Sequence, residues 1–153
     1  MRTLTTLINL HNLLEMKLSI LWATLAGGVT LMLVGFVLYV LLLPNVFGNL
    51  GLSEEHMKAE PEMLWIFIGN IGGALLLAHV FDKWASITTF PTGAKAGAIF
   101  GFLIAIYAGF IQFATTVIGT SITPYIVDAF VSAFLWAIAG GVVGLILGKT
   151  ASN

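Results

Sequence analysis

Four uninterrupted apolar runs constrain the fold of this chain more than any other feature. They cover residues 18–43, 63–82, 93–118 and 123–148. Crossing the hydrocarbon layer of a bilayer, roughly 30 Å thick, takes about 20 helical residues. Each run is therefore long enough to form one transmembrane helix. We predict an all-α, polytopic membrane protein in which residues 16–153 form a bundle of four transmembrane helices.

The composition agrees with a chain that is solvated by lipid. Of the 153 residues 59% are hydrophobic and only 8% are charged, whereas about 25% of the residues of a typical soluble domain are charged. Prolines stand only at the edges of the apolar runs, where a helix begins or ends at little cost. The chain contains no cysteine, which excludes disulfide frameworks, thiolate metal sites and cysteine nucleophiles.

The basic residues predict the orientation of the four helices. Lysine and arginine are enriched in cytoplasmic loops, and here they cluster on one side of the predicted bundle. We therefore expect the N-terminus, the loop between the second and third helices and the C-terminus in the cytoplasm. The basic residues on that side are Arg2, Lys17, Lys83, Lys95 and Lys149, and Lys58 stands on the other side among acidic residues.

Residues 1–15 precede the first apolar run. A helical spacing, typical of a short amphipathic helix lying on the inner membrane surface, relates Leu4, Leu7, Ile8, His11 and Leu14. The alternative is a tail, or an upstream extension of a protein that begins at Met16. Both interpretations separate this segment from the domain formed by residues 16–153.

Small residues recur every four positions along the third and fourth runs. Helices in lipid associate through close backbone approach, which small side chains permit. The ridges either close the bundle of one chain or face a second copy or partner protein, and Gly101→Leu should disrupt assembly in both cases. The ridge residues are Gly93, Gly97, Gly101, Ala105 and Gly109 in the third run, and Gly140, Gly144 and Gly148 in the fourth.

Polar side chains within the predicted helices are the candidate site residues, because a polar group at bilayer depth is costly without a partner. Gln112, Thr116 and Asp128 fall at similar depths near the outer surface, with Asn70 deeper in the second helix. They would line a shallow polar cavity open to the outside. The alternative is ordinary hydrogen bonding between helices.

Two further groups of titratable residues carry weaker signals. His79 lies three and four residues before Asp82 and Lys83, a spacing that fits a proton relay or a plain interfacial anchor. The outer loop holds Ser53 as a predicted helix cap, and its acidic residues and histidine lack the spacing of a metal site. Those loop residues are Glu54, Glu55, His56, Glu60 and Glu62. We expect no enzymatic activity, no cofactor and no nucleic-acid binding, because the corresponding motifs and basic patches are absent from the sequence.

Two segments carry a resemblance to a known family. Residues 38–57 contain an aromatic residue, a Phe-Gly pair and a Gly-Leu-Ser-Glu-Glu string, and residues 125–144 contain an aspartate, Asp128, near the start of the last helix. The chain resembles a bacterial four-helix inner-membrane family that is known only as a domain of unknown function. This resemblance implies a protein of the bacterial inner membrane and no particular activity. Leu38 stands where that family has a tryptophan. The matching residues of the first segment are Tyr39, Phe47, Gly48, Gly51, Leu52, Ser53, Glu54 and Glu55.

Two function classes follow from these features. The first is a structural or accessory membrane subunit that forms a homo-oligomer or joins a larger membrane complex through its glycine ridges. The second is a transporter or channel for a small solute or ion, lined by Asn70, Gln112 and Asp128. A continuous polar path would favour transport, whereas a filled interior with an exposed small-residue face would favour assembly.

Overall fold

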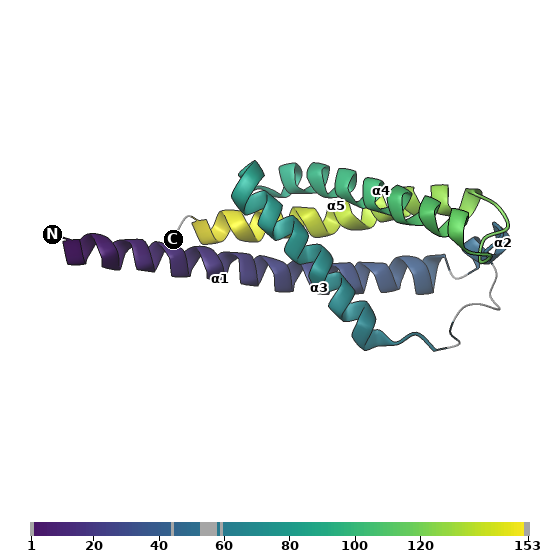
Figure 1. Ribbon diagram of the computed structural model, residues 1–153, viewed down its shortest axis with the longest axis horizontal. Helices are drawn as coiled ribbons and strands as arrows, with labels where there is room; N and C mark the ends of the chain where they lie inside the picture. Colours follow the sequence, from purple (N-terminus) through teal and green to yellow (C-terminus); the bar gives the residue numbers. More distant parts are fainter. Residues whose placement is uncertain (1, 44, 53–57, 59, 152–153) are drawn as a thin grey trace.

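The computed structural model of the chain describes residues 2–43, 45–52, 58 and 60–151 (Figure 1). The predicted cap Ser53 and the loop residues Glu54, Glu55 and His56 lie outside the described residues. The described part is helical apart from its connections. Its elements are α1 (Arg2–Gly35), η1 (Phe36–Leu42), α2 (Val46–Asn49), α3 (Met63–Val80), η3 (Phe81–Ala85), α4 (Phe90–Thr115) and α5 (Thr123–Ala151), η1 and η3 being π-helical.

The prediction of an all-α chain with four membrane-spanning helices is confirmed. Among the described residues, four helical stretches are long and apolar enough to cross a membrane. A lipid bilayer is the environment that such stretches require. The four stretches are Leu18–Leu42, Met63–Ala85, Phe90–Thr115 and Thr123–Thr150.

The third span lies three residues earlier than the sequence predicts. Helix α4 begins at Phe90 because the Thr89 side chain caps it by accepting a hydrogen bond from the Thr92 N–H (3.4 Å), and Pro91 fits the first turn of a helix. It ends at Thr115 rather than at 118. There the hydroxyls of Thr115 and Thr116 donate to carbonyl oxygens of the preceding turn, a local bonding that competes with helix continuation.

Helix α1 runs without interruption from Arg2 into the first span. Residues 2–15 are therefore helical and continuous with that span, and no turn separates them from it (Figure 1). The part before Leu18 adds roughly 24 Å to the rod at 1.5 Å per residue. Its position at the membrane surface stays a prediction.

Both ends of the described chain lie at the same end of the molecule, which we call the terminal end (Figure 1). The connection between α3 and α4 lies there as well. The opposite end, which we call the loop end, carries α2 and the connection between α4 and α5. Helix α3 crosses α1 obliquely, so that its start at the loop end lies away from α4 and α5 (Figure 1).

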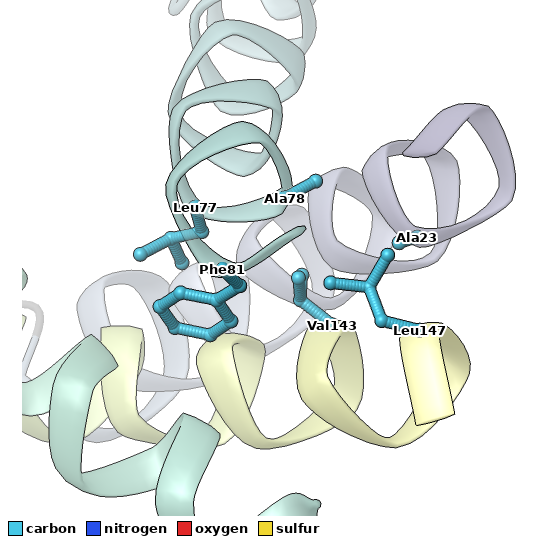
Figure 2. Packing of buried hydrophobic residues seen from close by; sticks show 6 residues of the cluster. All are labelled: Ala23, Leu77, Ala78, Phe81, Val143 and Leu147. Atoms are coloured by element: carbon cyan, nitrogen blue, oxygen red, sulfur yellow. The ribbon is translucent and has the colours of Figure 1, made fainter. Parts of the chain in front are cut away.

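A buried apolar cluster joins α1, α3 and α5 toward the terminal end (Figure 2). Phe81 of η3 is fully buried against Val143 and Leu147 of α5, and Ala23 brings the backbone of α1 close to them. In lipid such packing is held by dispersion and shape rather than by exclusion of water. The remaining members of the cluster are Leu77 and Ala78.

Helices α4 and α5 form a hairpin whose contact is made by backbone. A methyl group added to Gly97 would collide with the Trp136 carbonyl oxygen, and one added to Gly101 would meet the Ser132 carbonyl oxygen at 2.5 Å. The glycine ridge of the third run is therefore used inside this chain. Gly93, Gly140 and Gly144 lie at the same contact, and Gly109 packs against the ring of Tyr125.

Hydrogen bonds between loops close the loop end. Thr120 donates both its backbone N–H (2.8 Å) and its hydroxyl (3.0 Å) to the Gly51 carbonyl oxygen. Ser121 donates its hydroxyl to the Leu50 carbonyl oxygen at 3.1 Å. Gly51 takes a φ of 108°, which glycine adopts without strain. We call these bonds the loop clasp, and it ties the segment after α2 to the segment before α5.

Candidate functional site

A pocket of about 600 Å³ lies at the loop end, between η1, α4 and α5 and beneath α2. We call it the loop-end pocket. Apolar side chains form most of its wall, and its polar groups come from the three spans. This combination of an apolar wall and a few placed polar groups is typical of small-molecule sites. Its polar side chains are Tyr39, Gln112, Tyr125 and Asp128.

Asp128 supplies the only carboxylate that lines this pocket among the described residues. It lies five residues into the fourth span, or about 8 Å along the helix at 1.5 Å per residue. The hydroxyl of Tyr39 donates to its Oδ1 at 2.7 Å. The same hydroxyl lies 3.4 Å from the Ser132 hydroxyl, one turn deeper in α5. The carboxylate is thus held by a neutral donor.

The backbone of η1 places Tyr39 on this wall of the pocket. The N–H of Leu43 bonds to the Leu38 carbonyl oxygen, five residues back (2.9 Å), instead of four residues back as in an α-helix. Such π-helical turns occur frequently at functional sites. The Tyr39 ring also stacks against Phe47 of α2, with ring centroids 5.7 Å apart. Both residues line the pocket.

Two of the four predicted cavity residues line the same pocket, and the other two do not. Gln112 and Asp128 line the loop-end pocket together. Thr116 is exposed beyond the end of α4, and its hydroxyl donates to the Gln112 backbone carbonyl oxygen at 2.8 Å. It stabilises the end of the helix, and it is not among the residues that line this pocket.

Asn70 lies on the opposite side of the rod formed by α1 and η1. It lines a second cavity of about 540 Å³ between α1, α3 and α5, which we call the side pocket. Most of the wall of the side pocket is apolar. Tyr39 is part of the wall of both pockets, so this residue stands between Asn70 and the loop-end pocket. The oblique course of α3 is the reason that Asn70 does not reach Asp128.

The predicted group of His79, Asp82 and Lys83 lies near the terminal end. Asp82 pairs with its neighbour Lys83, with Oδ2 and Nζ 2.8 Å apart. The ring of His79 lies edge-on to Trp84, with centroids 5.8 Å apart. Both arrangements are those expected of side chains at a membrane interface.

Sequence reasoning gave Tyr39 no role at the site, and it did not place Tyr125 there. Tyr39 entered only through the resemblance, since an aromatic residue near a span end is usual at a membrane interface. Nothing in the string Phe36–Leu42 signals a π-helix. Tyr125 is 5% exposed, and its hydroxyl finds no hydrogen-bond partner within the described residues. A buried hydroxyl of this kind is costly, and its position on the pocket wall became evident only from the fold.

Comparison of the chain with family models, with curated proteins and with solved structures finds no match.

Proposed function

We propose that this protein is a transporter or channel for a small solute, which it receives in the loop-end pocket. The observation that carries the proposal is a carboxylate within a span, Asp128, lining a pocket of about 600 Å³. A charged side chain at membrane depth is rare, and it usually marks a solute or ion pathway. If the spans packed at this place without a gap, no such cavity would remain.

The loop-end pocket lies beside the long hairpin contact between α4 and α5, which supports this choice over assembly. The glycines of that contact are consumed by internal packing. They therefore leave little surface on that ridge for a second copy. The small residues build a close hairpin, and the pocket lies between its loop-end part and η1.

Cysteine accessibility tests the proposal, because the natural chain contains no cysteine. Ala105 lines the loop-end pocket in the middle of α4. In Ala105→Cys the new thiol should react with a small, membrane-impermeant methanethiosulfonate added on the loop side of reconstituted vesicles. The thiolate is the reactive form, and it forms only where water reaches the side chain. Reaction should also occur, more slowly, with reagent added on the terminal side.

Leu103→Cys is the matched control. Leu103 is 58% exposed on the same helix, does not line the loop-end pocket, and would face lipid. Its thiol should stay unreactive from both sides. Reaction of Ala105→Cys from neither side would overturn the proposal. Reaction from the loop side alone would contradict transport and leave a binding site.

We further propose a bacterial inner-membrane location with both termini in the cytoplasm. The terminal end carries the basic positions 83, 95 and 149, which the positive-inside rule assigns to the cytoplasmic side. The loop end, with its acidic connection, then faces outward, and the pocket takes solute from outside. Impermeant labelling of single cysteines in intact cells tests this orientation, since a thiol at Lys58 should react and one at Lys95 should not.

A second candidate function is an accessory subunit that forms a homo-oligomer or joins a larger membrane complex. It is favoured by Gly69 and Gly72 of α3, where no heavy atom from other parts of the described chain lies within 4 Å of the position of an added methyl group. These glycines leave a smooth stretch of α3 on which another helix can pack closely. Purification in mild detergent should then yield a defined oligomer that Gly72→Leu dissociates. A wild-type chain that runs as a monomer would contradict this candidate.

A further inference from the structure

Among the side chains that the structure describes, no basic residue pairs with the carboxylate of the loop-end pocket. Asp128 forms no ion pair with the lysines whose side chains the structure describes. Lys149 lies about 30 Å away along α5 at 1.5 Å per residue, and Lys58 pairs with Glu62. Lys83 and Lys95 belong to η3 and to the start of α4, at the terminal end. A cationic ligand would supply the missing charge.

The wall beside the carboxylate is aromatic. The rings of Tyr39 and Phe47 stack on one side of the pocket, and Tyr125 contributes a third ring from α5. An aromatic face attracts a cation through its quadrupole, and sites for alkylammonium groups commonly combine such rings. A carboxylate next to these rings adds direct attraction between opposite charges.

A bare metal ion fits the site less well. The described residues contain no group of three or more His, Cys, Asp or Glu side chains that could hold a metal ion. Hard cations such as Ca²⁺ take six or more oxygen ligands, whereas the pocket wall is mostly apolar. An alkylammonium group needs one counter-charge and an apolar, aromatic surface.

We propose that the loop-end pocket binds an alkylammonium group, with Asp128 as its counter-charge and the rings of Tyr39 and Phe47 as its aromatic wall. This inference rests on the proposed function, because it names the chemistry of the solute that the pocket would receive. A free small amine and the ammonium of a lipid headgroup share this chemistry, and the experiment separates the two.

Binding of three related probes to the full-length protein tests the inference. Tetramethylammonium, neopentyl alcohol and pivalate are each built on a tetrahedral centre that bears at least three methyl groups, and they carry positive, zero and negative charge. Calorimetry in nanodiscs of pure phosphatidylglycerol should show tetramethylammonium binding at least tenfold more tightly than the other two. Asp128→Asn keeps the shape of the side chain and should abolish this preference.

The variants separate charge from packing. Phe47→Leu keeps the wall apolar but removes a ring, and should weaken tetramethylammonium binding about threefold, as expected from a single exposed cation–π contact. Asp82→Asn removes the carboxylate near the terminal end and should leave binding unchanged. The anionic lipid surface attracts cations equally in all the variants. A difference between Asp128→Asn and Asp82→Asn therefore reports on the protein site alone. Thermal unfolding of each variant checks that it folds.

Nanodiscs that contain phosphatidylethanolamine distinguish the two sources of the ammonium group. If the lipid headgroup enters the pocket, tetramethylammonium should bind several-fold more weakly there, and Asp128→Asn should remove the difference. Equal binding in both nanodiscs would indicate a free amine. Both results support an alkylammonium site.

Two outcomes overturn the inference in distinguishable ways. If the neutral or anionic probe binds as tightly as the cation, and filling the pocket by Ala108→Trp blocks it, the pocket takes a solute of another class and the proposed function stands. If Asp128→Asn leaves tetramethylammonium binding intact, the site lies elsewhere. Failure of all three probes, together with an unreactive Ala105→Cys, would remove the proposed function too.

Discussion

The rod formed by α1 and η1 has two halves that differ in how the rest of the chain covers them. Toward the terminal end, Ala23 is fully buried, and Gly27 and Gly28 lie against α3 and α5. Toward the loop end, no residue of η1 is buried, and Leu42 is 63% exposed. One half is a tight helix contact, and the other half is the wall between two pockets.

The difference teaches where small and polar residues act in this membrane protein. In the packed half, small residues allow backbones to meet, and dispersion stabilises the contact. In the open half, the oblique course of α3 leaves space beside η1. There the hydrogen bond from Tyr39 to Asp128 connects η1 to α5. Stability is therefore expected to depend on the first half and solute binding on the second.

The largest effect is expected at the α4–α5 contact. Gly101→Leu should lower the free energy of unfolding by about 3 kcal/mol or more, because its first added carbon already meets the Ser132 carbonyl oxygen and overpacking typically costs 1–3 kcal/mol, occasionally more. Gly69→Leu is the control, because no other part of the described chain lies within 4 Å of a methyl group added there. Unfolding in an SDS titration measures both. Equal stabilities for the two variants would contradict the packed hairpin.

The next effect is expected at the hydrogen bond in the open half. Tyr39→Phe keeps the ring but removes the hydroxyl that donates to Asp128, which should cost about 1–3 kcal/mol of unfolding free energy. Asp128→Asn keeps an acceptor oxygen and should cost less. Tyr107→Phe, at a residue that is 71% exposed, controls for loss of a hydroxyl. A Tyr39→Phe protein as stable as wild type would show that the bond contributes nothing to folding.

A smaller effect is expected at the loop clasp. Ser121→Ala removes the hydroxyl that donates to Leu50 and accepts from the Thr123 N–H, and should cost about 1 kcal/mol. Thr115→Val is the control, since that hydroxyl bonds only within its own helix. Because the clasp holds the segment that carries Leu52, a lining residue of the loop-end pocket, labelling of Ala105→Cys should also become faster. Unchanged labelling would indicate that the clasp does not limit access.

The smallest effect is expected outside both halves. Lys58 pairs with Glu62, and their side chains are 70% and 51% exposed. Exposed ion pairs contribute about 0–1 kcal/mol. Lys58→Ala should therefore change the unfolding midpoint by no more than the measurement error at physiological salt. A shift comparable to that of Ser121→Ala would mean that this loop is part of the folded core.

The spans were predictable because a bilayer imposes length and apolarity on any helix that crosses it. The order of depth along each helix followed directly, and it brought Gln112 and Asp128 to the same level. The direction of α3 was not predictable, since it depends on how Gly27 and Gly28 seat against Ala74 and Ile71. Asn70 therefore lies on the far side of η1 from Asp128.

Tyr39 was missed for a related reason. Its hydroxyl reaches Asp128 only because η1 has π-helical rather than α-helical winding. The spacing of apolar residues along the sequence carries no sign of such a change, because all of η1 is apolar apart from the Tyr39 hydroxyl. The polar pair across α1 and α5 depends on that local departure from regularity.

The π-helical winding of η1 depends on the number of residues between Gly35 and Leu43. A chain with one residue fewer there could continue as an ordinary α-helix. Each α-helical residue advances the side chains by about 100°, so the tyrosine would turn away from Asp128. In evolutionary terms, insertion or deletion of a single apolar residue would switch the carboxylate between a held and an unheld state, with every polar side chain of the site left in the sequence.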